Sequence, residues 1–459
     1  MHPPESTPIT IDESRRGLRL LVLNTALAAV GYCVAIETLL LYFGSVHLGN
    51  FRFREILLLL AAIFAVSRLV APVLIRRFDG LRVLAITASI AAACALAALP
   101  IVPRVFPIDD RLALRICAGL FMLFVACEAI GSVAIWTWTG ELAPEQVRGK
   151  YLGWRESMRC LALVPTLIVT GYIVLSWRTV RMPAIAKLTH HSLAVWVGCL
   201  FLLAAALVLL GVRDAKGLRD SKSIAWRALI KPVLDPHFSR LILFGVWTSF
   251  FMALSLPAME FFPRYTLEVR ALTPFLLLAA AKLGQSAVSP WIGRSCDSFG
   301  NVPVILISQI VASFVPFFYL PANPQQSWWI GVAAVFLMGQ VGIHLGLTNL
   351  MFKLSPAGQR SAYIAVFSAA TCLAFAVGNM VGYFLLELLT FQKFRIAGWS
   401  LDDYEYVFYM AWTTQLMGLL ILIGLKEPGT ASLWTQISQR LGRSSQTLVS
   451  ESAMRHPLD

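Results

Sequence analysis

Long apolar stretches alternate with short polar segments along almost the whole chain. Each stretch approaches the ~20 residues that an α-helix needs to cross a bilayer core about 30 Å thick. Backbone amides find no water to bond in lipid, so such stretches must be helical. The pattern therefore predicts an all-α membrane protein with twelve transmembrane helices. They are expected at residues 20–43, 55–75, 83–102, 112–138, 152–176, 191–212, 241–262, 271–293, 303–320, 327–352, 362–388 and 405–425.

One long polar segment divides the twelve spans into two sets of six. Residues 213–240 form the expected linker between one bundle at 20–212 and a second bundle at 241–425. Residues 1–19 and 426–459 are expected to be tails on the same side as the linker. Together with the short loops on that side, these segments hold about twice as many lysines and arginines as the loops opposite. The positive-inside rule therefore places both termini in the cytoplasm, and we expect the chain in the cytoplasmic (plasma, or cell inner) membrane.

The composition agrees with this pattern and excludes several classes of protein. Hydrophobic residues make up 58% and charged residues 14% of the 459 residues, and the mean hydropathy is +0.72. The net charge of +13 comes from basic loops between spans, so we expect contact with the lipid bilayer and no nucleic-acid partner. The eight cysteines contain no C-x2-C pair, so neither disulfides nor a metal site are predicted. We expect a monomer.

Two short motifs recur at nearly the same offset in the two halves. The copies of the first, which follows the second span of each half, are Pro72, Arg76 and Asp79, and Pro290, Arg294 and Asp297. The copies of the second, which follows the fourth span, are Pro144, Arg148 and Tyr151, and Pro356, Arg360 and Tyr363. Ordered repeats of this kind predict a parallel duplication, with two halves of the same topology related by an axis along the membrane normal.

The same loops resemble those of the major facilitator superfamily (MFS). The segment GRSCDSFGN matches the G-x3-D-x2-G signature between the second and third helices of a half, with Gly293, Asp297 and Gly300 in the motif positions. The segment GELAPEQVRG resembles the E-x6-R loop after the fourth helix, with Glu141 and Arg148 in register. The resemblance covers nearly the whole chain. It implies a secondary transporter built as two pseudo-symmetric six-helix bundles.

In that family a cytoplasmic charge network latches one access state. The resemblance assigns this gate role to Asp79, Arg76, Glu141, Arg148, Gly293, Arg294, Asp297, Gly300 and Arg360. Independently, Asp79 and Asp297 each precede an apolar span and are expected to face the positive N-terminal end of the helix that follows. The alternative interpretation is ordinary capping combined with positive-inside anchoring.

The chain departs from the family pattern in both halves. The first-half loop reads VLIRRFDGL, with Arg77 where the signature aspartate stands. The second E-x6-R loop begins with Lys353, which cannot form an ion pair with Arg360. The sequence therefore does not decide whether that loop takes part in the latch.

Isolated polar residues near the middle of spans are the candidate substrate and proton pathway. Ionisable groups at this depth cost at least ~2.5 kcal/mol and are seldom kept without a partner or a cavity. Lys282 and Glu128 lie near the centres of spans 8 and 4, and Glu37 lies in the outward half of span 1. Gln340 and His344 share one helix face in span 10. By the family resemblance, these side chains converge on a central cavity.

Each of these residues has two interpretations. A buried glutamate with a raised pKa can carry a proton, and Lys282 can bind an anion; the alternative is a buried ion pair between Lys282 and a glutamate. His344 is either a proton relay or a hydrogen-bonded interior residue. Arg159 and Arg155 either take an anionic group or extend towards the interface, and extension is favoured for Arg155.

No catalytic motif is present. G-x4-G-K-[ST], H-E-x2-H and G-x-S-x-G are all absent, so we expect no enzyme activity and no cofactor. The sequence favours a secondary transporter that moves a small solute by alternating access, with proton coupling as a hypothesis. The alternatives are an uncoupled facilitator and a non-transporting membrane sensor. Sugars, organic anions, amino acids and drugs all remain candidate substrates.

Overall fold

The computed structural model describes residues 11–46, 50–78, 80–105, 111–179, 184–213, 227–270, 272–389, 394–396, 399–425 and 427–428. The first half contains α1 (Ile11–Val46), α2 (Asn50–Arg77), α3 (Leu81–Ala98), η1 (Leu99–Ile101), α4 (Val102–Val105), α5 (Arg111–Leu142), η2 (Glu145–Val147), α6 (Arg148–Thr179), α7 (Ala184–Val208) and η3 (Leu209–Gly211). The second half contains α8 (Arg227–Leu234), α9 (Pro236–Tyr265), α10 (Thr273–Phe299), α11 (Asn301–Phe317), η5 (Pro324–Gln326), α12 (Trp329–Phe336), α13 (Gly339–Leu354), α14 (Arg360–Leu389), β1 (Phe394–Ile396), β2 (Trp399–Leu401) and α15 (Asp403–Ile423).

The predicted helical membrane fold is confirmed. Within the described ranges, ten helical segments are long and apolar enough to cross a bilayer. The two other predicted spans, the fifth and the ninth, coincide with α6 and with α11, a shorter apolar helix. One antiparallel hairpin, β1 with β2, interrupts the helical pattern before α15. Helix α1 begins at Ile11, before the expected start of the first span. Acidic residues in its first turn interact favourably with the positive N-terminal end of the helix dipole.

The predicted tenth span is broken into α12 and α13. Leu337 and Met338 lie between the two helices, and the Leu337 carbonyl accepts a hydrogen bond of 2.8 Å from Gln285 of α10. A side chain at Gly339 would meet the backbone of α11, 2.8 Å from the Ser308 oxygen, so the chain needs glycine here. Breaks of this kind are tolerated in membranes when neighbouring protein groups satisfy the freed backbone atoms.

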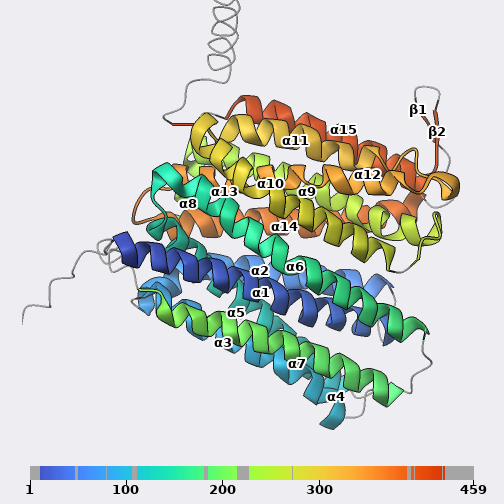
Figure 1. The fold of residues 1–459 in the computed structure, drawn as a ribbon, viewed down its shortest axis with the longest axis horizontal. Helices are drawn as coiled ribbons and strands as arrows, with labels where there is room; N and C mark the ends of the chain where they lie inside the picture. Colours follow the sequence, from blue (N-terminus) through green and yellow to red (C-terminus); the bar gives the residue numbers. More distant parts are fainter. Residues whose placement is uncertain are drawn as a thin grey trace, which may run out of the picture.

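The helices form two groups that follow the order of the chain. Figure 1 shows α1 to α7, coloured blue to green, on one side and α9 to α15, coloured yellow to red, on the other. Helix α6 packs along α10, and α14 packs against α2, so the groups meet along two seams. These seams bring residues far apart in the sequence into contact.

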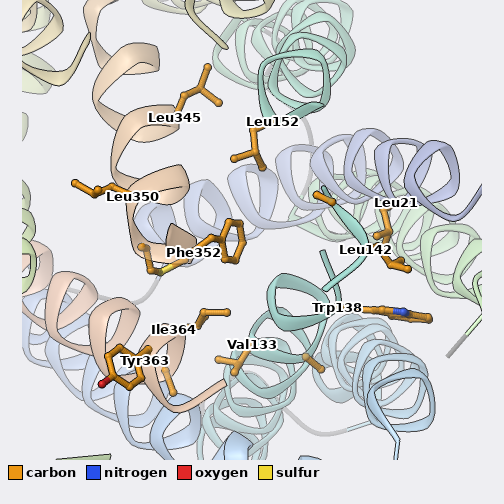
Figure 2. Packing of buried hydrophobic residues seen from close by; sticks show 14 of the residues in the cluster. Leu21, Val133, Trp138, Leu142, Leu152, Leu345, Leu350, Phe352, Tyr363 and Ile364 are labelled. Atoms are coloured by element: carbon orange, nitrogen blue, oxygen red, sulfur yellow. The ribbon is translucent and has the colours of Figure 1, made fainter. Parts of the chain in front are cut away.

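The apolar cores differ between the two ends of the molecule. We call the end that carries residues 139–151, 293–302 and 352–363 the motif end, and the opposite end the distal end. At the motif end one cluster joins both groups, and ten of its members are labelled in Figure 2: Leu21, Val133, Trp138, Leu142, Leu152, Leu345, Leu350, Phe352, Tyr363 and Ile364. The distal end holds separate clusters, one around Phe124 of α5 and Val195 of α7, the other around Phe262 of α9 and Phe408 of α15.

Candidate functional site

A cavity of about 480 Å³ lies between the two groups of helices. Most of its wall comes from α1, α5 and α6 of the first half, and Leu278 and Lys282 come from α10 of the second half. Its polar lining side chains are Asn24, Thr25, Tyr32, Ser89, Glu128, Ser132, Arg155, Arg159 and Lys282. The volume suits a small organic molecule. The cavity therefore gathers three of the predicted pathway residues, Glu128, Arg159 and Lys282.

Arg155 of α6 is held firmly in the cavity wall. Its Nε donates a hydrogen bond of 2.8 Å to Thr25 Oγ1 on α1, and its guanidinium lies 4.0 Å from the centre of the Trp136 ring on α5. Only 8% of the residue is exposed. The expected extension of Arg155 towards the interface is wrong, because the stacking surface and the hydroxyl acceptor are both inside the bundle.

Arg159, one helical turn further along α6, forms a two-point ion pair with Glu156. Its Nε donates to Glu156 Oε2 at 2.8 Å, and its Nη2 lies 2.5 Å from Glu156 Oε1. Glu156 is buried, and its Oε1 also accepts a longer contact of 3.4 Å from the Cys160 thiol. Sequence reasoning missed Glu156, although its spacing from Arg159 puts the two side chains on one helix face.

Lys282 enters the cavity from the opposite half. Its Nζ donates a hydrogen bond of 2.8 Å to Gln285 Oε1, and Gln285 in turn donates to the Leu337 carbonyl at the α12–α13 break. Lys282 does not form the alternative ion pair with Glu128, which accepts a short hydrogen bond from the Tyr32 hydroxyl instead, and the side chain of Glu37 lies outside the described residues. The two charges occupy the same cavity without pairing.

Glu128 also borders a second cavity of about 380 Å³, lined mainly by apolar side chains of α1, α2 and α5. Arg68 of α2 lies close enough for electrostatic attraction to Glu128. The Arg68 guanidinium lies 4.1 Å from the Phe64 ring, and its Nη1 donates to the Ser368 carbonyl of α14 at 2.9 Å. The carboxylate thus lies where α2 of one half meets α14 of the other.

The other pathway candidates are His344, Gln340 and Glu37, and the first two are not among the residues that line the cavity. His344 of α13 nevertheless lies close to the site: its imidazole centre is 6.4 Å from the Trp136 ring centre, and it interacts electrostatically with Glu156, Arg159, Arg155 and Lys282. Gln340 also belongs to α13 and is not part of the cavity lining. Glu37 belongs to α1, but its side chain lies outside the described residues.

At the motif end, Asp297 caps a helix of the opposite half. Its Oδ1 accepts from the Gly149 amide and its Oδ2 from the Lys150 amide, both at 2.7 Å, at the start of α6. The expectation that Asp297 faces the helix that follows it is wrong. The amides of Asn301 and Val302 at the start of α11 instead bond Glu427, which follows α15. Asp79, the first-half counterpart, lies outside the described residues.

The two arginines of the E-x6-R loops also contact the opposite half. Arg360 Nη1 donates to the Gly140 carbonyl at 2.8 Å and forms an ion pair of 2.9 Å with Glu141. Arg148 lies with its guanidinium 5.7 Å from the Phe352 ring. Lys353, which cannot pair with Arg360, forms a 3.0 Å ion pair with Glu427 inside its own half.

Two glycines of the G-x3-D-x2-G motif have clear structural reasons. Gly300 has φ of 91°, a region that residues with a side chain seldom adopt, and it joins α10 to α11. Gly293 lies against the backbone of Gly149, where a Cβ atom would clash.

The remaining predicted gate arginines are Arg76 and Arg294. Arg76 is half-buried near the end of α2. Arg294 is exposed and has no hydrogen-bond or ion-pair partner within the residues that the structure describes.

These features define a membrane transporter fold, and the comparisons with known proteins name its family. Residues 112–379, more than half of the chain, match the family model of the Major Facilitator Superfamily. The chain therefore belongs to this superfamily. It is also 28% identical over 138 residues to the tetracycline resistance protein, class B, of Escherichia coli. That alignment covers 30% of this chain and only 33% of the curated relative.

Solved structures of other transporters share the fold at low sequence identity. The human organic anion transporter MFSD10 (TETRAN) superposes with a TM-score of 0.68 and 13% identity, over 92% of this chain and all (100%) of that chain. The E. coli fucose:proton symporter FucP superposes with a TM-score of 0.64 and 14% identity, over 88% and 98% of the two chains. At these identities the likeness concerns the fold alone.

Proposed function

We propose that this chain is a secondary transporter that moves a small solute across a membrane by alternating access. The observation that carries the proposal is the cavity between the two groups of helices, in which charged side chains of both halves meet. Charges at membrane depth are retained where they face a solute or ion pathway. Membership of the superfamily supports transport rather than catalysis, and the proposed cycle uses no cofactor.

The two bundles, residues 20–212 and 241–425, are the proposed moving units, joined by the linker 213–240. The gate consists of the contacts between the halves at the motif end, with Asp297 and Arg360 as its central members. We place this gate, both termini and the linker on the cytoplasmic side of the plasma membrane because of the basic residues there. Opening the gate would then release solute to the cytoplasm or admit it.

Proton coupling is the second part of the proposal, and Glu128 and Glu37 are its carriers. Glu128 bonds Tyr32 and lies between the large cavity and the smaller apolar one. A carboxyl at such a boundary can take a proton in one access state and lose it in the other. The fucose:proton symporter that shares the fold is a transporter named for this type of coupling.

The test begins with a ligand. Compounds from metabolite and drug libraries that raise the melting temperature of the detergent-purified protein bind its folded state. Each one is then measured for flux into liposomes that contain the protein, with and without a pH gradient. We expect the gradient to drive flux in the wild type, and this response to disappear in the double variant Glu37→Gln, Glu128→Gln.

The outcomes separate the candidate functions. Binding without flux for every ligand would contradict transport and favour a membrane sensor. Flux that ignores the pH gradient in the wild type would identify an uncoupled facilitator. Coupling that persists in the double variant would remove the two glutamates from the proposal. Exposed Arg115 supplies the control, and Arg115→Gln should transport like the wild type.

A further inference from the structure

The terminal guanidinium nitrogens of Arg155 are available to bind a ligand in the cavity. Its Nε is bonded to Thr25 and one face of its guanidinium is covered by Trp136. Within the part of the chain that the structure describes, its two terminal nitrogens have neither a hydrogen-bond acceptor nor a carboxylate partner. They are nevertheless not sealed off, since Arg155 lines the cavity. A planar guanidinium fixed in this way presents two parallel N–H donors to a carboxylate or phosphate.

The charges around the cavity do not balance. Arg159 is neutralised by Glu156, and Glu128 lies near Arg68 at the other side of the cavity. Arg155 and Lys282 form no direct ion pair with a carboxylate among the described residues, and Glu156, which attracts both at longer range, is already paired with Arg159. An uncompensated buried charge is costly. The missing counter-charge is the feature that a bound anion would supply.

From this arrangement we propose that the cavity binds an organic anion whose carboxylate or phosphate group is held between Arg155 and Lys282. This inference rests on the proposed transport function and names its substrate class. The walls around these cations also include Ile135, Leu163, Leu167 and Leu278, against which an apolar part of the solute would pack. Trp136 positions Arg155, and Gln285 positions Lys282.

The two cations come from different halves, and this gives the anion a role in the cycle. Arg155 belongs to α6 and Lys282 to α10, the helices that form one of the two seams. Like charges repel when the seam closes around an empty cavity, and an anion between them converts repulsion into attraction. A bound anion therefore favours the state in which both cations face one cavity.

The experiment uses four probes of similar shape: phenylbutyrate, phenylbutylphosphonate, phenylbutylamine and phenylbutanol. The melting temperature of the full-length protein in detergent is recorded against the concentration of each probe. We expect the two anions to raise it and the amine and the alcohol to leave it unchanged. The relative strength of phenylbutyrate and phenylbutylphosphonate distinguishes a carboxylate solute from a phosphate solute.

Substitutions of Arg155 and Lys282 test whether these two cations bind the anion. Arg155→Gln and Lys282→Gln should each weaken anion binding by roughly tenfold or more, whereas Arg115→Gln should not change it. If Arg155→Gln does not fold, Arg155→Lys keeps the charge but loses the two-point geometry and should still lower affinity. Equal binding of the amine, or unchanged anion affinity in folded Lys282→Gln and Arg155→Lys, would overturn the inference.

Failure of this inference is distinguishable from failure of transport. Binding is measured without a bilayer, so anions that bind but never cross liposome membranes would contradict transport and leave the anion site standing. Flux of cationic or neutral solutes alone, with no anion binding, would contradict the anion site and leave transport standing.

Discussion

The motif end and the distal end of this protein are built from the same helices but hold the two halves together very differently. At the motif end one apolar cluster passes through both halves, and Asp297 and Arg360 add polar contacts across the seam. At the distal end each half has its own core, centred on Phe124 in one and on Phe262 in the other. A smaller cluster of Cys33, Leu167 and Ala279 joins α1, α6 and α10.

This difference indicates which end separates more easily. Parting the halves at the motif end exposes shared apolar surface and breaks hydrogen bonds, and both changes cost free energy. Parting them at the distal end leaves the two main cores intact. The structure is therefore a state closed at the motif end, and in the proposed transport cycle ligand or proton binding would offset the cost of opening there.

The largest expected effect comes from emptying one core at each end. Phe352→Ala and Phe262→Ala each remove a buried ring and should destabilise the fold by about 3–5 kcal/mol. Only Phe352 belongs to the shared cluster. Spin labels at exposed Gln146 and Arg294 should therefore report wider distances in Phe352→Ala, while Phe262→Ala keeps the wild-type distribution. Equal distributions in both variants would show that the shared core does not hold the motif end closed.

A smaller effect is expected from overpacking the α6–α10 seam. A Cβ atom at Gly153 would lie 2.5 Å from the Ser289 carbonyl oxygen, a backbone atom that cannot move aside. Gly153→Val should raise the free energy of the closed motif end by about 1–3 kcal/mol, which shifts the ratio of open to closed molecules by roughly five- to 150-fold. The same pair of spin labels measures this ratio.

Gly119→Val is the matched control, because a Cβ atom at Gly119 of α5 meets nothing within 4 Å. Its distance distribution should match that of the wild type. Closure that persists in Gly153→Val would mean that the seam can adjust, contrary to the tight approach of α6 and α10 described above.

The smallest expected effect concerns the ion pair between Glu141 and Arg360. The two side chains are 26% and 12% exposed, so a double-mutant cycle with Glu141→Gln and Arg360→Gln should give a coupling of about 0.5–1 kcal/mol on the open-to-closed ratio. Glu260 and Arg264 form a more exposed pair within one half, and its removal should leave the ratio unchanged. A coupling of zero for the first pair would restrict the latch to the apolar core and Asp297.

The sequence was sufficient for the membrane fold, because apolar runs and their spacing are local signals. The family resemblance predicted that Glu37, Glu128, Lys282, Gln340 and His344 converge on one cavity, and of these Glu128 and Lys282 line the cavity, whereas Gln340 and His344 do not. Sequence reasoning failed for Arg155, since a one-dimensional pattern does not show whether an arginine near a helix end points to Trp136 or to the interface. The α12–α13 break was missed for a related reason, because Leu337 and Met338 are ordinary helix formers and their partner, Gln285, is distant in sequence.

Contacts between the halves were the hardest to predict. Asp297 was expected to cap the next helix, because sequence reasoning considers neighbours along the chain. The actual donors, the amides of Gly149 and Lys150, are brought to it by the packing of α6 on α10. Glu427 illustrates the same point, since nothing near it in the sequence indicates that it bonds the start of α11.

The hydrogen bonds between Asp297 and the first turn of α6 must be replaced by hydrogen bonds to water when the two halves separate. Each time the contact breaks, a carboxylate and two peptide N–H groups must be rehydrated together, and water has to be drawn into the crevice before the apolar surfaces slide apart. In the proposed cycle, hydration of this contact therefore accompanies every opening of the motif end.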